Sequence, residues 1–162
     1  MPRRNLLSSA AVVVAAAVAV APGTAAAGRD AKPKRFHCTI EAIAQGVPNP
    51  SGIHLGFTGC PKPFGKGLHF NAYTVTSKPS PGVPGAVSGT FKNYYNRGTT
   101  RGTFAMTIVA SSQANLTYSG TVTYTGGTAA FRRVKGGGTI QCTTTDGGTH
   151  KSCTVNSTLT GV

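Results

Sequence analysis

The sequence predicts an all-β protein: a single antiparallel eight-stranded β-barrel with two disulfides, or a two-sheet sandwich as the alternative. Three observations lead to this fold class. Short segments that alternate apolar and polar residues recur at regular spacing, Gly, Pro and Asn separate them, and no segment shows a helical period. The frequent Thr and Tyr residues suit pleated, half-exposed strands.

The N-terminal residues 1–27 have the pattern of a secretory signal peptide. Arg3 and Arg4 precede an apolar run from Leu6 to Ala21, and Ala25 to Ala27 offer a small-residue cleavage site. The apolar run is shorter than the roughly 20 residues of a membrane span, which disfavours the alternative of an uncleaved anchor. We therefore expect a secreted, extracellular protein without a transmembrane segment after cleavage. The Ala- and Val-rich leader on a Gly- and Thr-rich body indicates a bacterial origin. Residues 28–34 would form a short, basic, flexible lead-in.

Residues 35–162 are expected to form one β-barrel domain, because that length suffices for a single core. In the first strand, Phe36, Cys38 and Ile40 share an apolar face. The Pro-rich segment 78–84 reads as a loop within the domain. Alternation continues in the fifth, sixth and last strands. The expected strands are 35–45, 52–59, 67–77, 86–95, 101–110, 115–125, 137–145 and 150–160.

Four cysteines in an exported chain predict two disulfides, for which three pairings exist. The segment Asp146-Gly-Gly-Thr149 has the composition of a two-residue hairpin turn. Counting outward from it places Cys142 directly opposite Cys153, within disulfide reach. The remaining pair is Cys38–Cys60. A zinc site of four cysteines is the alternative, and both the export signal and the lack of a Cys-x-x-Cys knuckle disfavour it.

The chain is strongly basic, with 16 Lys and Arg against three Asp and Glu and a formal net charge of +13. Cleavage after residue 27 removes two of the cations and leaves a net charge of +11. Such a surface attracts extracellular or cell-surface polyanions. The alternative is that the charge only maintains solubility, since the cations are scattered along the chain.

One segment resembles a known family. Tyr124-Thr-Gly-Gly-Thr-Ala-Ala-Phe131, followed by Gly136-Gly-Gly-Thr-Ile140, is similar to the Gly-Gly-Thr-Gly-x-Phe turn of the allene oxide cyclase and dirigent-like barrels. Gly89-Thr-Phe91 and Gly102-Thr-Phe104 extend the resemblance, although Ala129 stands where the family turn has a glycine. The resemblance implies an eight-stranded barrel with a hydrophobic cavity. Plant members steer the cyclisation or coupling of reactive intermediates.

The same resemblance implies Glu41 as a candidate catalytic acid or base. In the cyclase family, a first-strand acid and a proline-held water act at the barrel mouth, and Glu41 and Pro50 are similar in placement. Ile43 replaces the polar partner of that motif, however. Strand parity also places Glu41 opposite the apolar face of its strand, which predicts an outward, solvated carboxylate.

Other catalytic classes lack their residues. Asp30 and Asp146 lie in the lead-in and in a turn, so the paired carboxylates of glycosidases and the triad of serine hydrolases are missing. The four histidines have no metal-ligand spacing, and no phosphate-binding glycine motif occurs. We therefore expect no metal and no cofactor, and the sequence favours a binding protein over an enzyme.

Aromatic and basic residues interleave in 91–101, which is typical of surfaces that bind polymers. The alternative is an ordinary cationic hairpin in which one Tyr packs inward. We predict either a small apolar ligand in the barrel or an anionic polymer on a basic rim, without specific nucleic-acid recognition. A dirigent-like or cyclase-like enzyme is the alternative function. The candidate ligand-binding residues are Tyr94, Tyr95, Arg97, Arg101, Arg132, Arg133 and Lys135.

Overall fold

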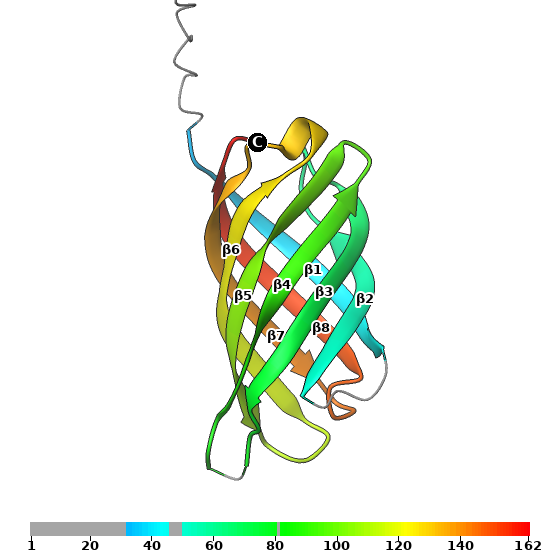
Figure 1. Cartoon of the computed structure of the whole chain (residues 1–162), viewed down its shortest axis with the longest axis vertical. Helices are drawn as coiled ribbons and strands as arrows, with labels where there is room; N and C mark the ends of the chain where they lie inside the picture. The colour runs from blue at the N-terminus through cyan, green and yellow to red at the C-terminus, as the bar shows by residue number, and fades with distance from the viewer. Residues whose placement is uncertain (1–31, 46–49, 81) are drawn as a thin grey trace, which may run out of the picture.

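The computed structural model describes residues 32–45, 50–80 and 82–162 and shows a closed antiparallel barrel (Figure 1). Each of its eight strands pairs with its neighbours in sequence, and β8 closes the barrel on β1. The predicted barrel is therefore confirmed, and the sandwich alternative is not what the chain forms. The predicted signal peptide (1–27) and the first part of the lead-in lie outside the described residues.

The strands match the expected segments to within a few residues at each end. Because successive side chains point to opposite faces of a strand, every second residue points into the barrel. In β8 these inward residues include Cys153, Val155 and Leu159. The eight strands are β1 (Lys34–Gln45), β2 (Ser51–Gly59), β3 (Lys66–Ser77), β4 (Gly85–Tyr95), β5 (Gly98–Ala110), β6 (Leu116–Gly127), β7 (Lys135–Thr144) and β8 (His150–Thr160).

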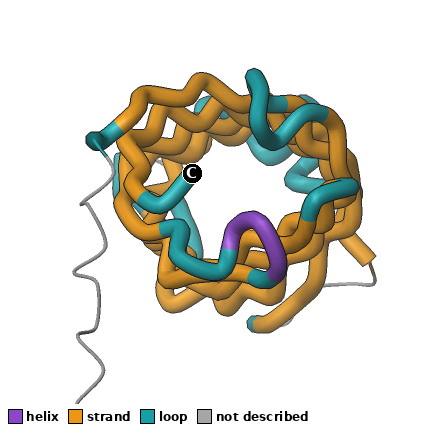
Figure 2. The backbone as a smooth tube through the Cα atoms, turned by 90° about the horizontal axis from the view of Figure 1, so that it is seen from above, coloured by secondary structure: helices purple, strands orange, loops and turns teal. Residues whose placement is uncertain are grey.

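Aromatic side chains close one end of the barrel, here called the plugged end. The short 3-10 helix η1 (Ala129–Phe131) leans over the ring of strands there (Figure 2). Phe131 is 1% exposed, and its ring centroid lies 4.8 Å from that of Phe64 and 5.8 Å from that of Tyr95. Phe36 packs edge-on against Phe64 at 5.1 Å. The opposite end, between β3 and β4 and between β7 and β8, is here called the mouth.

The segment that joins β6 to β7 needs unusual backbone angles to reach over the ring. Gly126 and Gly136 have φ values of 143° and 134°, which glycine adopts without steric cost. Ala129 has φ 48°, in the left-handed region, and it is the only non-glycine residue with positive φ in the described part of the chain. This turn lets η1 insert Phe131 into the plugged end. None of the described helices is long and apolar enough to cross a bilayer.

Both predicted disulfides are confirmed. Cys142 lies directly opposite Cys153 in the β7–β8 ladder, and Cys38 of β1 bonds to Cys60 just after β2. The ladder ends earlier than a two-residue turn predicts, at the pair Thr143 and Ser152. The reason is local: the Asp146 carboxylate accepts hydrogen bonds from the Thr144 hydroxyl and the His150 backbone N–H, which holds a wider turn.

In strand β2 the apolar residues face outward and polar residues face the barrel interior, the reverse of the usual arrangement. Its outward residues Ile53, Leu55 and Phe57 are 39%, 45% and 68% exposed, whereas His54 and Thr58 are buried inside the barrel. Leu68 of β3, 55% exposed, continues this apolar strip on the outer face. The barrel interior therefore carries polar groups on its β2 side.

Candidate functional site

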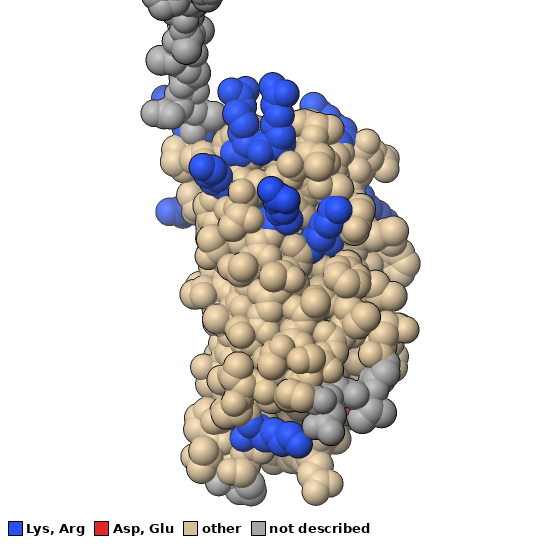
Figure 3. Space-filling view, viewed as in Figure 1, with Lys and Arg blue, Asp and Glu red and all other residues tan. Residues whose placement is uncertain are grey.

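The cations of this protein gather at the plugged end. Of the 13 Lys and Arg in the described residues, ten are exposed near this end and Lys92 is half-buried slightly further along β4, whereas only Lys78 and Lys151 lie near the mouth. Figure 3 shows the clustering on one face. The described acids, Glu41 and Asp146, both lie in the mouth half. The ten exposed cations are Lys32, Lys34, Arg35, Lys62, Lys66, Arg97, Arg101, Arg132, Arg133 and Lys135.

Strand topology causes this segregation. In an up-and-down barrel the odd strands all begin at the same end, and β1, β3 and β7 each begin with a lysine. The β4–β5 turn and the η1 segment are bonded to each other there. The Ala130 backbone N–H donates to the Arg97 carbonyl at 3.1 Å, and the Thr128 N–H donates to the Thr99 carbonyl at 3.0 Å. The two cationic segments predicted from the sequence therefore form one surface.

The two candidate tyrosines, Tyr94 and Tyr95, point to opposite faces of β4. Tyr94 points outward, 43% exposed, and Lys92 lies over its ring at 4.8 Å from the centroid. Tyr95 packs in the aromatic plug, and burial raises the pKa of its phenol. Tyr94 is thus available to a surface ligand together with the cations, and Tyr95 shapes the closed end instead.

The candidate acid Glu41 lies on the outer face of β1. It is exposed, and its carboxylate accepts a hydrogen bond of 2.6 Å from the Ser152 hydroxyl on β8. It borders an external hollow that is also lined by Ile43, Leu55 and Phe57. The sheet wall separates Glu41 from the barrel interior, as strand parity predicts.

A chain of polar side chains crosses the interior from β2 to β5. His54 Nδ1 lies 3.0 Å from Asn71 Oδ1, Asn71 Nδ2 lies 2.9 Å from His69 Nε2, and His69 Nδ1 lies 2.7 Å from Asn93 Oδ1. Asn93 in turn donates to the Thr100 hydroxyl at 3.4 Å. These contacts are mutually consistent only when each amide oxygen accepts and both histidines carry their proton on Nδ1.

Both interior histidines are held neutral. Burial lowers the pKa of His54 from 6.5 to about 4, with a further contribution from the positive charge of Lys151. Burial likewise lowers the pKa of His69. With its proton on Nδ1, His54 presents the lone pair of Nε2, and that atom has no hydrogen-bond partner among the described residues. The Asn71 amide and the Gly148 backbone favour the charged form, but only Asn71 is in hydrogen-bonding geometry.

Lys151 is the only charged residue among the buried residues of the described chain. It is 9% exposed, and its ammonium lies 4.2 Å from the Tyr118 ring centroid and 5.2 Å from that of Tyr73. Burial lowers the pKa of this lysine from 10.5 to about 8. Its ammonium makes no ion pair with the acids in residues 32–45, 50–80 and 82–162. The two aromatic faces offset part of the cost of burying the charge.

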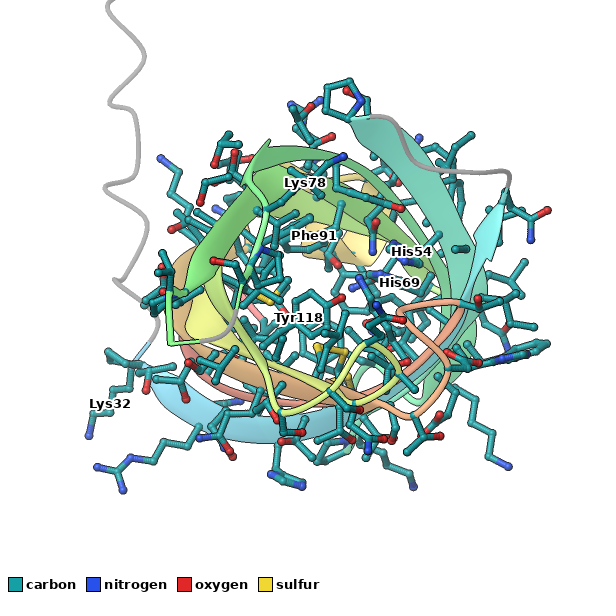
Figure 4. All side chains as sticks on the ribbon, turned by 90° about the horizontal axis from the view of Figure 1, so that it is seen from below. Lys32, His54, His69, Lys78, Phe91 and Tyr118 are labelled. Carbon is teal, nitrogen blue, oxygen red and sulfur yellow. A yellow bond between two sulfur atoms is a disulfide. The ribbon has the colours of Figure 1, made fainter. Side chains whose placement is uncertain are left out.

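Lys151 stands where two cavities meet. An inner cavity of about 40 Å³ is lined mainly by apolar residues, among them Phe91 and Met106. A cavity of about 160 Å³ at the mouth is bordered by Pro50, Lys78 and Tyr118. Lys151 and Tyr73 line both. Seen from below, His54, His69, Phe91 and Tyr118 lie within the ring of strands and Lys78 lies at its rim (Figure 4).

Comparison with known proteins gives no relative. No protein-family model matches the chain, and neither a curated protein nor a solved structure matches it. The function therefore has to be argued from the charges, cavities and contacts of this barrel.

Sequence reasoning overlooked the interior polar residues, although their positions carried a signal. In β8 the inward set of odd-numbered residues begins with Lys151, two positions before Cys153. In β2 the polar residues occupy one parity and Ile53, Leu55 and Phe57 the other, which marks a strand with a polar inner side. The described residues contain no cluster of three His, Cys, Asp or Glu that could hold a metal ion.

Proposed function

We propose that this protein is exported and binds an anionic extracellular polymer through its plugged end. The observation that carries the proposal is the segregation of charge: ten exposed Lys and Arg near one end, with both described acids in the other half. A polymer bearing repeated carboxylate or sulfate groups gains from many such cations at once, because each contact displaces counterions.

The spread of the cations over this surface suits an extended polymer more than a compact ligand. The cations stand on four separate segments around the end of the barrel: the start of β1, the β2–β3 connection, the β4–β5 turn and the η1 segment. Tyr94 lies opposite Thr99 in the hairpin that also carries Arg97 and Arg101, and its exposed ring offers a stacking platform for a sugar ring. A guanidinium also binds carboxylate and sulfate-like groups through paired hydrogen bonds.

Export is supported by the chemistry of the cysteines. All four cysteines are paired and none is free among the described residues, as is typical of proteins that fold in oxidising compartments. The signal-peptide pattern of residues 1–27 points the same way. An extracellular location would bring the cationic end into contact with acidic polysaccharides.

The test measures binding of the 28–162 protein to heparin and to polygalacturonate across a range of salt concentrations. We expect log K to fall linearly with log salt concentration. The double variant Arg132→Gln/Arg133→Gln removes two charges, so the magnitude of the slope should fall by about 1 to 2. Lys78→Glu at the mouth changes the net charge by the same amount and serves as the control.

The outcome with the control decides between a specific surface and overall charge. If Lys78→Glu weakens binding as much as the double arginine variant does, net charge alone attracts the polymer and the proposed surface is wrong. Binding that does not respond to salt would contradict the proposal equally, because contacts between charged groups are screened by ions.

Nothing in the described interior favours the cyclase-like alternative. That reaction would need an acid at the barrel interior, and Glu41 instead faces outward beside Ser152. The candidate proton-transfer groups that do line the cavity are His54, His69 and Lys151, for which the resemblance implies no role. The binding function therefore remains the proposal.

A further inference from the structure

Besides Ser157 Oγ, which does not line the inner cavity, two polar groups in the interior have bonding capacity that the described residues leave unused. One is the Lys151 ammonium, which contacts two aromatic faces and forms no ion pair with the described acids. The other is the lone pair of His54 Nε2, buried and without a hydrogen-bond partner among the described residues. Buried polar groups are normally satisfied, so this pair calls for a complementary molecule.

The two groups lie together at the wall of one cavity. His54 and Lys151 both line the inner cavity, and the charge of Lys151 contributes to the low pKa of His54. Tyr73 links them spatially: its ring stacks on that of His54 at 4.5 Å and lies under the Lys151 ammonium. A single small molecule can therefore contact both groups.

The rest of the cavity wall is mainly apolar, although His69, Asn71 and Asn93 also line it. Its inner wall includes Ile40, Phe91, Phe104, Met106 and Ile140. The volume of about 40 Å³ compares with roughly 10–15 Å³ needed by one water on the same measure, so a short hydrocarbon tail fits there but a bulky ring system does not. The mouth cavity gives access to Lys151 from solvent.

We propose that the barrel interior is a binding site for a small hydroxy acid with a short apolar tail. The carboxylate accepts hydrogen bonds from the Lys151 ammonium, and the hydroxyl donates to His54 Nε2. The tail occupies the apolar cavity between Phe91 and Met106. This site is separate from the cationic surface of the plugged end, so either proposal can fail without the other.

The chemistry of the two groups selects this ligand class over simpler ones. A plain alcohol could satisfy His54 but would leave the lysine unpaired, and a plain fatty acid would do the reverse. A buried group left without a partner costs free energy, so the ligand with both groups gains over each. The other charged or titratable groups around Lys151 are Tyr73 on β3, Tyr118 on β6, and Lys78 and Asp146 near the mouth.

The experiment compares four ligands with six carbons by calorimetry at pH 7: 2-hydroxyhexanoate, 3-hydroxyhexanoate, hexanoate and 1-hexanol. The better hydroxy acid should bind about fivefold or more tighter than hexanoate, and hexanoate about tenfold or more tighter than hexanol. The methyl NMR signal of Met106 reports whether the tail enters the cavity. Shortening the tail by one carbon should weaken binding by about fourfold.

Variants separate the two contacts. Lys151→Met should abolish the preference for acids over the alcohol, and His54→Phe should abolish the preference for the hydroxy acid over hexanoate while keeping the stack on Tyr73. Arg132→Gln/Arg133→Gln is the control for acids bound at the plugged end and should change neither preference.

Three results would overturn the proposal: equal binding of hexanoate and hexanol to the unmodified protein, an unshifted Met106 signal at saturation, or no binding of any of the four at millimolar concentration. The first comparison needs no variant, so it decides the matter even if His54→Phe fails to fold.

Discussion

Ala129 has a strained backbone conformation that allows the chain to form the aromatic plug. Its φ of 48° lies in the left-handed region, where a Cβ is unfavourable, and the residue begins the η1 turn that delivers Phe131 to the closed end. The turn of the resembled barrels has glycine at this place. The chain therefore tolerates strain at a position where glycine would fit.

We expect Ala129→Gly to raise the free energy of unfolding by up to about 1 kcal/mol, because relief of the left-handed conformation outweighs the added freedom of the unfolded chain. Ala130→Gly, one residue further along the same turn, is the control. It should lower stability, since no positive φ favours glycine there. Urea unfolding measures both, and a destabilised Ala129→Gly variant would contradict this account.

Lys151 makes stability depend on pH in the alkaline range. Its pKa falls from 10.5 in the unfolded chain to about 8 in the barrel, so between these values the unfolded state binds more protons. Stability should therefore rise as the pH increases from about 8. The rise should end near pH 10, because burial raises the pKa of Tyr118 to about 12 and the unfolded tyrosine loses its proton first.

Lys151→Met should remove this alkaline rise. At pH 7 the variant should also be more stable than the parent, by about 1–3 kcal/mol, because an apolar side chain of similar length replaces a buried unpaired charge. Unfolding in urea at pH 7 and pH 9.5 gives both values. An equal rise in the variant would show that another group is responsible.

At the scale of the strands, the fold could be predicted because alternation is a strong local signal. Phe104, Met106 and Ile108 lie inside β5 as their spacing indicates, and the opposition of Cys142 and Cys153 follows from counting residues around a glycine turn. The width of that turn could not be predicted, because it depends on which hydrogen bonds the Asp146 side chain forms.

The interior polar wall was harder to predict than the strands. Strand β2 alternates well, but the apolar residues Leu55 and Phe57 occupy its outer face and His54 its inner face. Only pairing with both neighbours settles the orientation of such a strand. The sequence predicts a basic rim from the segments of Arg97 and Arg132, but not the lysines that β1 and β3 add to the same end, because these strands come together only when the barrel closes.

The histidines of β2 and β3 should make the barrel sensitive to acid. His54 is neutral in the fold with a pKa of about 4, against 6.5 when unfolded, so stability should fall as the pH decreases from about 6.5 to 4. His54→Gln, which keeps a donor for Asn71, should reduce that loss. The measurement is urea unfolding at pH 7 and pH 4.5.

His37→Gln, on the exposed outer face of β1, is the matched control and should keep the full loss of the parent protein. If both variants respond to acid alike, the loss arises elsewhere, and the neutral state of the interior chain is not what limits stability.

At the scale of the whole molecule, charge and cavity occupy opposite ends. The exposed cations surround the plug, and Lys151 and Tyr118 stand at the mouth. The aromatic plug around Phe131 lies between the two regions. Each end can therefore bind its own ligand.

We expect the two ends to bind independently. The dissociation constant of the preferred hydroxy acid, measured by NMR through Met106, should change by less than about twofold when heparin saturates the protein. Linkage requires the reciprocal result, with heparin affinity unchanged by the acid. A tenfold change in either direction would show that the plug transmits a structural change.

Because of the aromatic plug, the barrel is closed at one end and has its cavity at the other. Among the described residues, Phe131 packs against Phe64 and Tyr95 at the closed end, and Tyr73 and Tyr118 border the cavity at the mouth. A protein bound to an acidic polymer through its plugged end would have its mouth on the side away from that polymer. The closed end thus decides which side of the molecule meets the surrounding medium.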